Sequence, residues 1–220
     1  MRRVIFLLII SGAGLAILLG LGTWQLQRMA WKEDLLQTIE SNIAAAPAGL
    51  PESPVKKRDR YLAVTVEGEI EGNELHVFWV TKDAETGYRV IAPFVTTDGR
   101  RVLLDRGFIS AAEKARPLTR GQVTVTGNLL WPDEGDWTTP APEVDTNILY
   151  ARDLAYMAER LNTEPVLIVA RSAEPEAAVT PQAVTTAGIP NNHLQYAITW
   201  FSLAFIWAVM TLYFLRRSRP

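Results

Sequence analysis

Two long apolar runs, one near each end of the chain, constrain its fold more than any other feature. Residues 4–21 form an uninterrupted run of apolar or small side chains, and residues 194–215 include no Asp, Glu, Lys or Arg. At 1.5 Å per residue, about 22 helical residues cover roughly 33 Å, which is enough to cross a bilayer. The chain is therefore expected to carry two transmembrane helices with a polar region between them.

The first run has a competing interpretation as a cleaved signal peptide, because Arg2 and Arg3 precede it. The apolar regions of signal peptides are only about 7–15 residues long. The sequence beyond this run also continues in residues that suit a helix. We therefore favour a transmembrane helix over 4–24 that continues as a helix to about residue 40.

Small residues in the first run predict the face on which the second helix docks. Small side chains let membrane helices approach each other closely. The expected docking face consists of Gly14, Gly20 and Gly22 with Ala13 and Ala16.

Basic residues next to both runs set the expected orientation. The tails 1–3 and 216–220 contain Arg and no acidic residue, which places both in the cytoplasm by the positive-inside rule. Residues 41–190 then form a domain on the outer side, and residues 191–215 form the second span. No Arg- and Ser-rich transit peptide precedes the first run. The periplasmic side of a bacterial inner membrane is therefore favoured over the mitochondrial intermembrane space.

The middle of the chain predicts a mostly antiparallel β domain, a barrel or a curled sheet, with one short helix. Strands are expected over 61–70, 75–80, 88–96, 101–109, 122–130, 147–150 and 166–169, and a helix over 153–161. Asp98-Gly99, between the third and fourth strands, is a strong hairpin signal. Short strands joined by hairpins are typical of antiparallel barrels.

Composition and motifs exclude several classes of function. The net charge of −2 argues against a nucleic-acid-binding protein. The absence of cysteine excludes disulfides, thiolate zinc sites, iron–sulfur clusters and cysteine nucleophiles. No common catalytic or nucleotide-binding motif is found, so no catalytic residue is predicted. Asp105 and Arg106 are interpreted as an ion pair at a strand end, and residues 133–136 as a solvated acidic loop.

The start of the second apolar run is the strongest candidate site. If Asn192 caps the helix, His193 lies in its first turn, where the helix dipole disfavours a protonated imidazole. A neutral imidazole is the form that binds a metal or haem iron. Tyr196 and Trp200, three and seven residues further on, share its face. The alternative is that His193 only caps the helix or contacts lipid headgroups.

A second group of residues, on the first helix, is expected at the same membrane depth. Trp24 and Trp31 share a face with Gln27 or Arg28. The permanent charge of Arg28 is able to pair with a carboxylate such as a haem propionate. Together the two groups predict an aromatic-walled cleft between the helices, although aromatic residues at this depth are also explained as interfacial anchors.

Two motifs at the membrane edges resemble the signatures of the surfeit locus protein 1 family. Residues 22–28 (Gly-Thr-Trp-Gln-Leu-Gln-Arg) with Trp31-Lys32 resemble its first-helix signature, and residues 192–201 (Asn-His-Leu-Gln-Tyr-Ala-Ile-Thr-Trp-Phe) resemble its second-helix signature. Internal blocks at 61–68, 86–94, 102–108 and 152–158 follow in the order of the family. The resemblance therefore covers nearly the whole chain.

The resemblance implies a non-enzymatic membrane protein that helps to assemble aa3-type cytochrome c oxidase. It implies that the chain binds haem a and helps its insertion into oxidase subunit I. His193 would be the axial ligand, with Arg28, Trp24, Tyr196 and Trp200 as pocket residues. The implied partners are oxidase subunit I, a haem a synthase and the lipid bilayer, with no nucleic acid. The alternative is a scaffold that stabilises subunit I without binding haem.

Overall fold

The computed structural model describes residues 2–116, 120–175 and 179–217, and the side chains from residue 5 onward. The chain divides into two units, one formed by residues 1–39 with 186–220 and the other by residues 40–185. The predicted tails, 1–3 and 216–220, lie partly outside the described residues.

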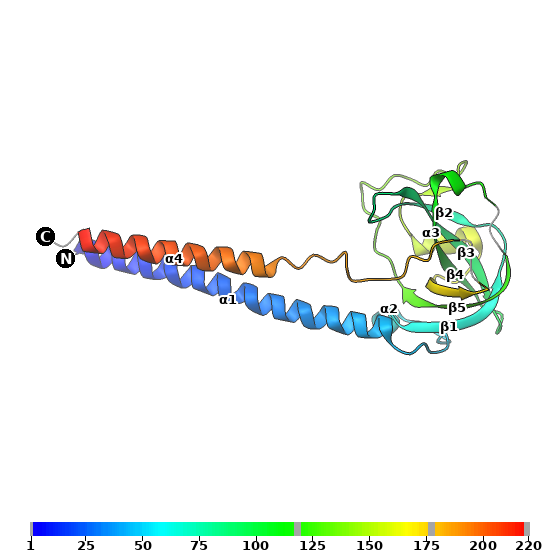
Figure 1. Ribbon diagram of the computed structural model, residues 1–220, viewed down its shortest axis with the longest axis horizontal. Helices are drawn as coiled ribbons and strands as arrows, with labels where there is room; N and C mark the ends of the chain where they lie inside the picture. The colour runs from blue at the N-terminus through cyan, green and yellow to red at the C-terminus, as the bar shows by residue number, and fades with distance from the viewer. Residues whose placement is uncertain (1, 117–119, 176–178, 218–220) are drawn as a thin grey trace. The chain divides into compact units, whose positions relative to one another are not determined.

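The first unit is a pair of antiparallel helices, α1 (Arg2–Ala44) and α4 (His193–Arg217). Figure 1 shows them side by side, with the N-terminal end of α1 next to the C-terminal end of α4. Both are long and apolar enough to cross a membrane. This result fits the expected membrane protein with two spans.

The least exposed residues of the two helices recur at every third or fourth position, which is the spacing of one face of an α-helix. They include Ser11, Gly14, Leu18, Gly22 and Gln25 on α1, and His193, Ala197, Trp200, Ala204, Ala208 and Thr211 on α4. This row of residues is called the seam below.

Two of the predicted docking glycines lie on the seam. A Cβ atom added to Gly22 would lie 2.7 Å from the ring of Phe201, and one added to Gly14 would lie 3.0 Å from the ring of Trp207. A Cβ atom on Gly20 would meet nothing within 4 Å. The prediction was therefore right for Gly14 and Gly22. It was wrong for Gly20 and for the exposed alanines at 13 and 16, because these positions lie off the seam.

The second unit is a closed β-barrel, which confirms the predicted fold class. Its strands are β1 (Ala63–Ile70), β2 (Leu75–Val80), β3 (Thr86–Thr96), β4 (Arg101–Ser110), β5 (Gly121–Leu130), β6 (Ile148–Leu149) and β7 (Leu167–Glu174). The order β1-β5-β7-β4-β3 closes on itself because β1 also pairs with β3. β2 and then the short β6 extend from β3. Most pairs are antiparallel, but β4 with β7 and β2 with β6 are parallel.

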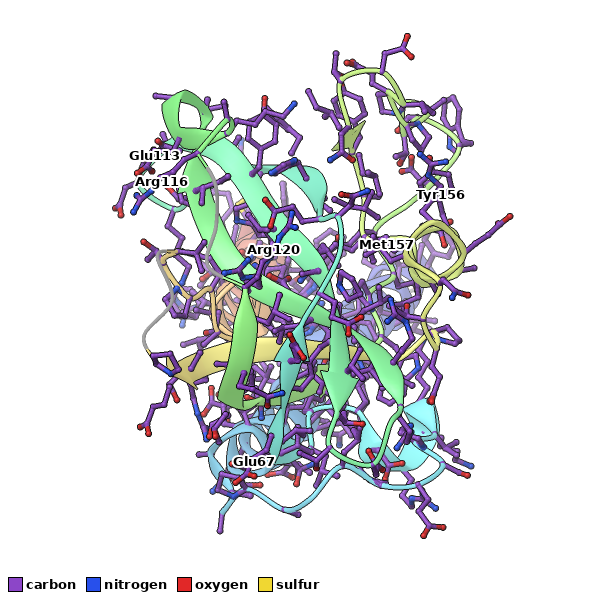
Figure 2. All side chains as sticks on the ribbon, turned by 90° about the vertical axis from the view of Figure 1, so that its right-hand side faces the viewer. Glu67, Glu113, Arg116, Arg120, Tyr156 and Met157 are labelled. Atoms are coloured by element: carbon purple, nitrogen blue, oxygen red, sulfur yellow. The ribbon has the colours of Figure 1, made fainter. Side chains whose placement is uncertain are left out.

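Two large apolar clusters hold the barrel, one inside it and one outside, and a third, small cluster joins Val90, Ile109 and Val179. The inner cluster takes residues from all five barrel strands, with Phe94 and Leu104 among the most buried. The outer cluster packs the helix α3 (Leu154–Leu161) against the sheet, and Met157, labelled in Figure 2, is fully buried there. Because neighbouring strand residues point to opposite faces, Leu103 serves the outer cluster and Leu104 the inner one.

Short secondary elements complete this unit. They are the helical turn α2 (Lys56–Asp59), the 3₁₀ turn η1 (Ala111–Glu113) and α3. The Asp153 side chain caps α3 by accepting hydrogen bonds from the backbone N–H groups of Ala155 and Tyr156, at 2.9 and 3.1 Å. The helix ends at Asn162, which adopts the left-handed conformation with a φ of 50°.

His76, the second histidine of the chain, is buried in this barrel. Its Nδ1 lies 3.3 Å from Nδ2 of Asn147, and its Nε2 lies 4.0 Å from Oε1 of Glu74. Burial, helped by the positive charge of Lys114, lowers the pKa of His76 to about 4. His76 is therefore a neutral structural side chain at physiological pH.

This pKa predicts a pH dependence of stability. An unfolded histidine titrates near 6.5, so between about pH 6.5 and 4 the unfolded chain binds a proton that the folded barrel does not. The barrel is expected to lose up to about 3 kcal/mol of stability as the pH falls through this window. His76→Gln should reduce that loss in urea unfolding of the full-length protein in detergent, followed by pulse proteolysis. If the free energy of unfolding falls with pH equally in both proteins, the pKa assigned to His76 is contradicted. Glu74 is present in both proteins, so its titration is removed when the two are compared.

Candidate functional site at the start of the second helix

The site lies where the first residue of α4 meets α1. His193 begins α4 directly after Asn192, at the position expected from the sequence. The antiparallel seam brings it to Gln25, which is only 8 % exposed. Nδ1 of His193 lies 2.8 Å from Oε1 of Gln25. Two residues 168 positions apart in sequence therefore form a polar side-chain contact in a largely apolar helix pair.

This contact sets the tautomer of the imidazole. Because an amide oxygen only accepts hydrogen bonds, Nδ1 of His193 carries the proton and donates it to Gln25. In the neutral ring this tautomer leaves the lone pair on Nε2, which has no hydrogen-bond partner among the described residues. Histidines that bind metals usually donate their other ring N–H to an oxygen acceptor in this way. In this tautomer, Nε2 is the nitrogen of His193 that could act as a metal ligand.

Two further contacts fix the start of α4 on α1. The ammonium group of Lys32 donates a hydrogen bond to the backbone carbonyl of Pro190, just before the helix. On the other side of His193, Phe201 packs on Gly22, one turn of α1 before Gln25. The imidazole is thus held between two points at which the helices are joined.

The predicted pocket residues of α4 lie on the same side of the helix as His193. Trp200 is partly exposed and lies on the seam, two turns from His193. Tyr196 is 55 % exposed, one turn from His193. Tyr196 is therefore exposed beside His193 and Trp200 lies against the helix pair, and the roles of both as pocket residues stay predictions.

The predicted pocket residues of α1 lie elsewhere. Trp24 is 53 % exposed, and Arg28 is exposed with its guanidinium 4.0 Å above the ring of Trp31. At 3.6 residues per turn, Trp24 lies about 130° and Arg28 about 90° around the helix from the seam. The structure therefore joins His193 to Gln25 and brings neither Trp24 nor Arg28 into the contact between the helices. The role of Arg28 as a partner for a carboxylate stays a prediction.

Gln25 is the site residue that the sequence analysis missed. The aromatic face of the first helix was expected to carry the site, whereas Gln25 lies about 100° around the helix from Trp24, on the side that faces the seam. One signal was available: Gln25 follows Gly22 by three positions, and a polar side chain on the packing face of a membrane helix is usually functional.

A second polar cluster, in the barrel, connects two arginines to two carboxylates. Asp105 is completely buried, and its Oδ2 accepts hydrogen bonds from Nε of Arg89 at 2.7 Å and from an Nη of Arg152 at 3.2 Å. Arg152 also binds Glu134 through Nε at 3.1 Å. The two guanidinium groups lie 5.0 and 5.4 Å from the ring of Trp79. The two positive charges of this cluster are balanced by its two carboxylates. We therefore interpret the cluster as a structural network.

This cluster corrects two predictions. The expected ion pair between Asp105 and Arg106 is not found. Asp105 instead pairs with Arg89 and Arg152, and Arg106, at a bulge of β4, approaches Glu74 at 3.4 Å. The acidic loop 133–136 is not uniformly solvated, because Glu134 is bound by Arg152. Burial raises the pKa of Glu134, but the hydrogen bonds and charge of Arg152 outweigh this effect and hold the pKa below its ordinary value.

Comparison with known proteins agrees with the two-motif resemblance. The model of the SURF1 family matches residues 13–205. Surfeit locus protein 1 of Rattus norvegicus is 32 % identical over 217 residues, covering 86 % of this chain and 70 % of the relative. The human protein of the same name is 31 % identical over 84 % of this chain and 69 % of its own length. A SURF1-like protein of Monosiga brevicollis is 32 % identical over 90 % of this chain and 83 % of its own length.

Proposed function

Because this chain belongs to the SURF1 family, we propose that it is a haem a carrier that assembles aa3-type cytochrome c oxidase. It binds haem a at the start of α4 and helps its insertion into subunit I. A haem a synthase supplies the haem. The protein acts in a bacterial inner membrane, with both termini in the cytoplasm and the barrel in the periplasm.

The contact between His193 and Gln25 carries this proposal. It holds the imidazole through Nδ1 and leaves Nε2 for a ligand, at one end of a helix pair that is long enough to span a membrane. Among the described residues, no group of three or more His, Asp or Glu side chains is arranged to hold a metal ion. A site with one histidine suits haem, because the porphyrin supplies the other four iron ligands.

A single protein ligand also suits a carrier. Delivery requires the haem to leave, and one imidazole holds iron less firmly than two. In this proposal Tyr196 and Trp200 contact the macrocycle. Arg28 pairs with a propionate at the membrane surface, a role for which its exposed position and permanent charge are suited. No chemical step is assigned to the protein, so the function is non-enzymatic.

Haem analysis of the purified protein tests the proposal directly. The full-length protein is purified in detergent from cells that make haem a and from cells in which haem a synthesis is deleted. Extracted haem is then identified by chromatography and absorbance. We expect haem a only in the first preparation. Two colourless preparations, from cells whose oxidase assembly nevertheless requires this protein, would support the scaffold function instead.

A further inference from the structure

An apolar groove lies between the two helices, nearer to the N-terminal end of α1 and the C-terminal end of α4 than His193 is. It is lined by residues between 7 and 18 of α1 and between 203 and 215 of α4, and its volume is about 770 Å³. Almost all the lining side chains are apolar. The hydroxyl of Thr211 is already satisfied, because it donates to the backbone carbonyl of Trp207 at 2.8 Å. A ligand of this groove therefore needs no polar groups, as is common for hydrophobic pockets of this size.

Trp207 builds one wall of the groove and connects the two helices. Its Nε1–H donates a hydrogen bond to the backbone carbonyl of Ser11 at 3.0 Å. Its ring packs against Gly14, where an added Cβ atom would lie 3.0 Å away. The groove is therefore a formed feature of the helix pair, held by a hydrogen bond and a close contact.

The groove and His193 lie on the same helices at a distance that one ligand can span. Leu203 begins the groove on α4, ten residues after His193, which corresponds to about 15 Å along the helix. No acidic or basic residue lies between them. A molecule with a metal-containing head at His193 and a long apolar tail would place the tail at this depth.

We propose that this groove holds the isoprenoid tail of haem a, an inference that rests on the proposed function. The axial ligand contacts only the iron, so it does not read the tail itself. Haem a and haem o carry a farnesyl-type chain that haem b lacks, so recognition of the tail selects between them. The free energy comes from van der Waals packing against the groove, since lipid is as apolar as protein here. A preference of about tenfold for the tailed haems is therefore expected, as for other small hydrophobic differences read by a pocket.

Titration with three haems tests the groove. The full-length protein is purified without haem in detergent, and the dissociation constants of haem a, haem o and haem b are measured by absorbance. The unmodified protein should bind haem a and haem o about tenfold more tightly than haem b. Leu203→Trp and Met210→Trp, which each fill part of the groove, should lower the affinity for haem a and haem o to that for haem b and leave haem b unchanged.

Phe205→Trp is the matched control, because Phe205 lies between the groove positions but is 71 % exposed and does not line the groove. It should leave all three constants unchanged. Equal affinity of the unmodified protein for haem o and haem b would overturn the inference while leaving the proposed function standing. If the preference for tailed haems survives both groove variants, the groove does not hold the tail and the inference is overturned. A lipid acyl chain would then be the remaining occupant of the groove. Failure to bind any haem would overturn the proposed function itself.

Discussion

His193→Ala should abolish the haem absorbance of the purified protein and lower its affinity for added haem by more than about 100-fold. The reason is that Nε2 of His193 is the iron ligand in our proposal, and removal of residues that merely support a metal ligand already costs about 10–100-fold. Absorbance spectra and haem titration of the full-length protein in detergent measure this loss. An unchanged spectrum would exclude His193 as the ligand.

Two variants separate ligation from general damage. His76→Gln removes the other histidine of the chain, which is buried in the barrel, and it should retain the haem band. Imidazole added to His193→Gly should restore a haem spectrum, because a free ring fills the space of the missing side chain. Restoration would show that the remaining pocket is intact.

Gln25→Leu should have a smaller effect on the same site, about tenfold in haem affinity. It removes the acceptor for Nδ1–H of His193 but keeps the ligand. The reduction potential of the bound haem gives a second readout. Gln25→Glu presents a charged acceptor, makes the imidazole a stronger donor and should lower the potential, whereas Gln25→Leu should raise it. Gln27→Leu, at an exposed position two residues away, is the matched control and should change neither quantity.

Asp105→Asn should destabilise the barrel by about 3–5 kcal/mol. Asp105 is the completely buried carboxylate that neutralises Arg89 and Arg152. The amide of asparagine carries no charge, so two guanidinium groups would be left buried with only Glu134 as an anionic partner. Breaking a buried ion pair by removing one partner is costly because the remaining charge has lost its solvation.

Urea unfolding of the full-length protein in detergent, followed by pulse proteolysis, measures this change. Asp83→Asn makes the same chemical substitution at an exposed position and should change the free energy of unfolding by no more than about 0.5 kcal/mol. A loss below about 1 kcal/mol for Asp105→Asn would show that water or rearrangement compensates the missing charge. Because Asp105 and His193 lie in different units, the folded fraction of Asp105→Asn should still bind haem.

The sequence predicted most of the secondary elements, although it missed α2 and η1 and ended the last strand at residue 169, where β7 continues to Glu174. Apolar runs of spanning length, alternating strand residues and the Asp98-Gly99 turn are local patterns, and each depends only on neighbouring residues. The expected strand over 75–80 agrees with β2, and that over 101–109 differs from β4 by one residue. His193 was also found in this way, because a polar residue at the start of an apolar helix is visible in one dimension.

Contacts between distant segments were decided only by the tertiary structure. The partner of His193 depends on which face of α1 meets α4, and several faces contain small or polar residues. The seam selected Gln25, Gly14 and Gly22 because packing must satisfy all contact positions of both helices at once. In the barrel, closure by β1 with β3 and the parallel insertion of β7 beside β4 brought Asp105 to Arg152. The sequence thus determined which chemical groups are present and in which elements they lie, whereas packing determined which of these groups are in contact. The reason is that a contact depends on two surfaces, and a local sequence pattern describes only one of them.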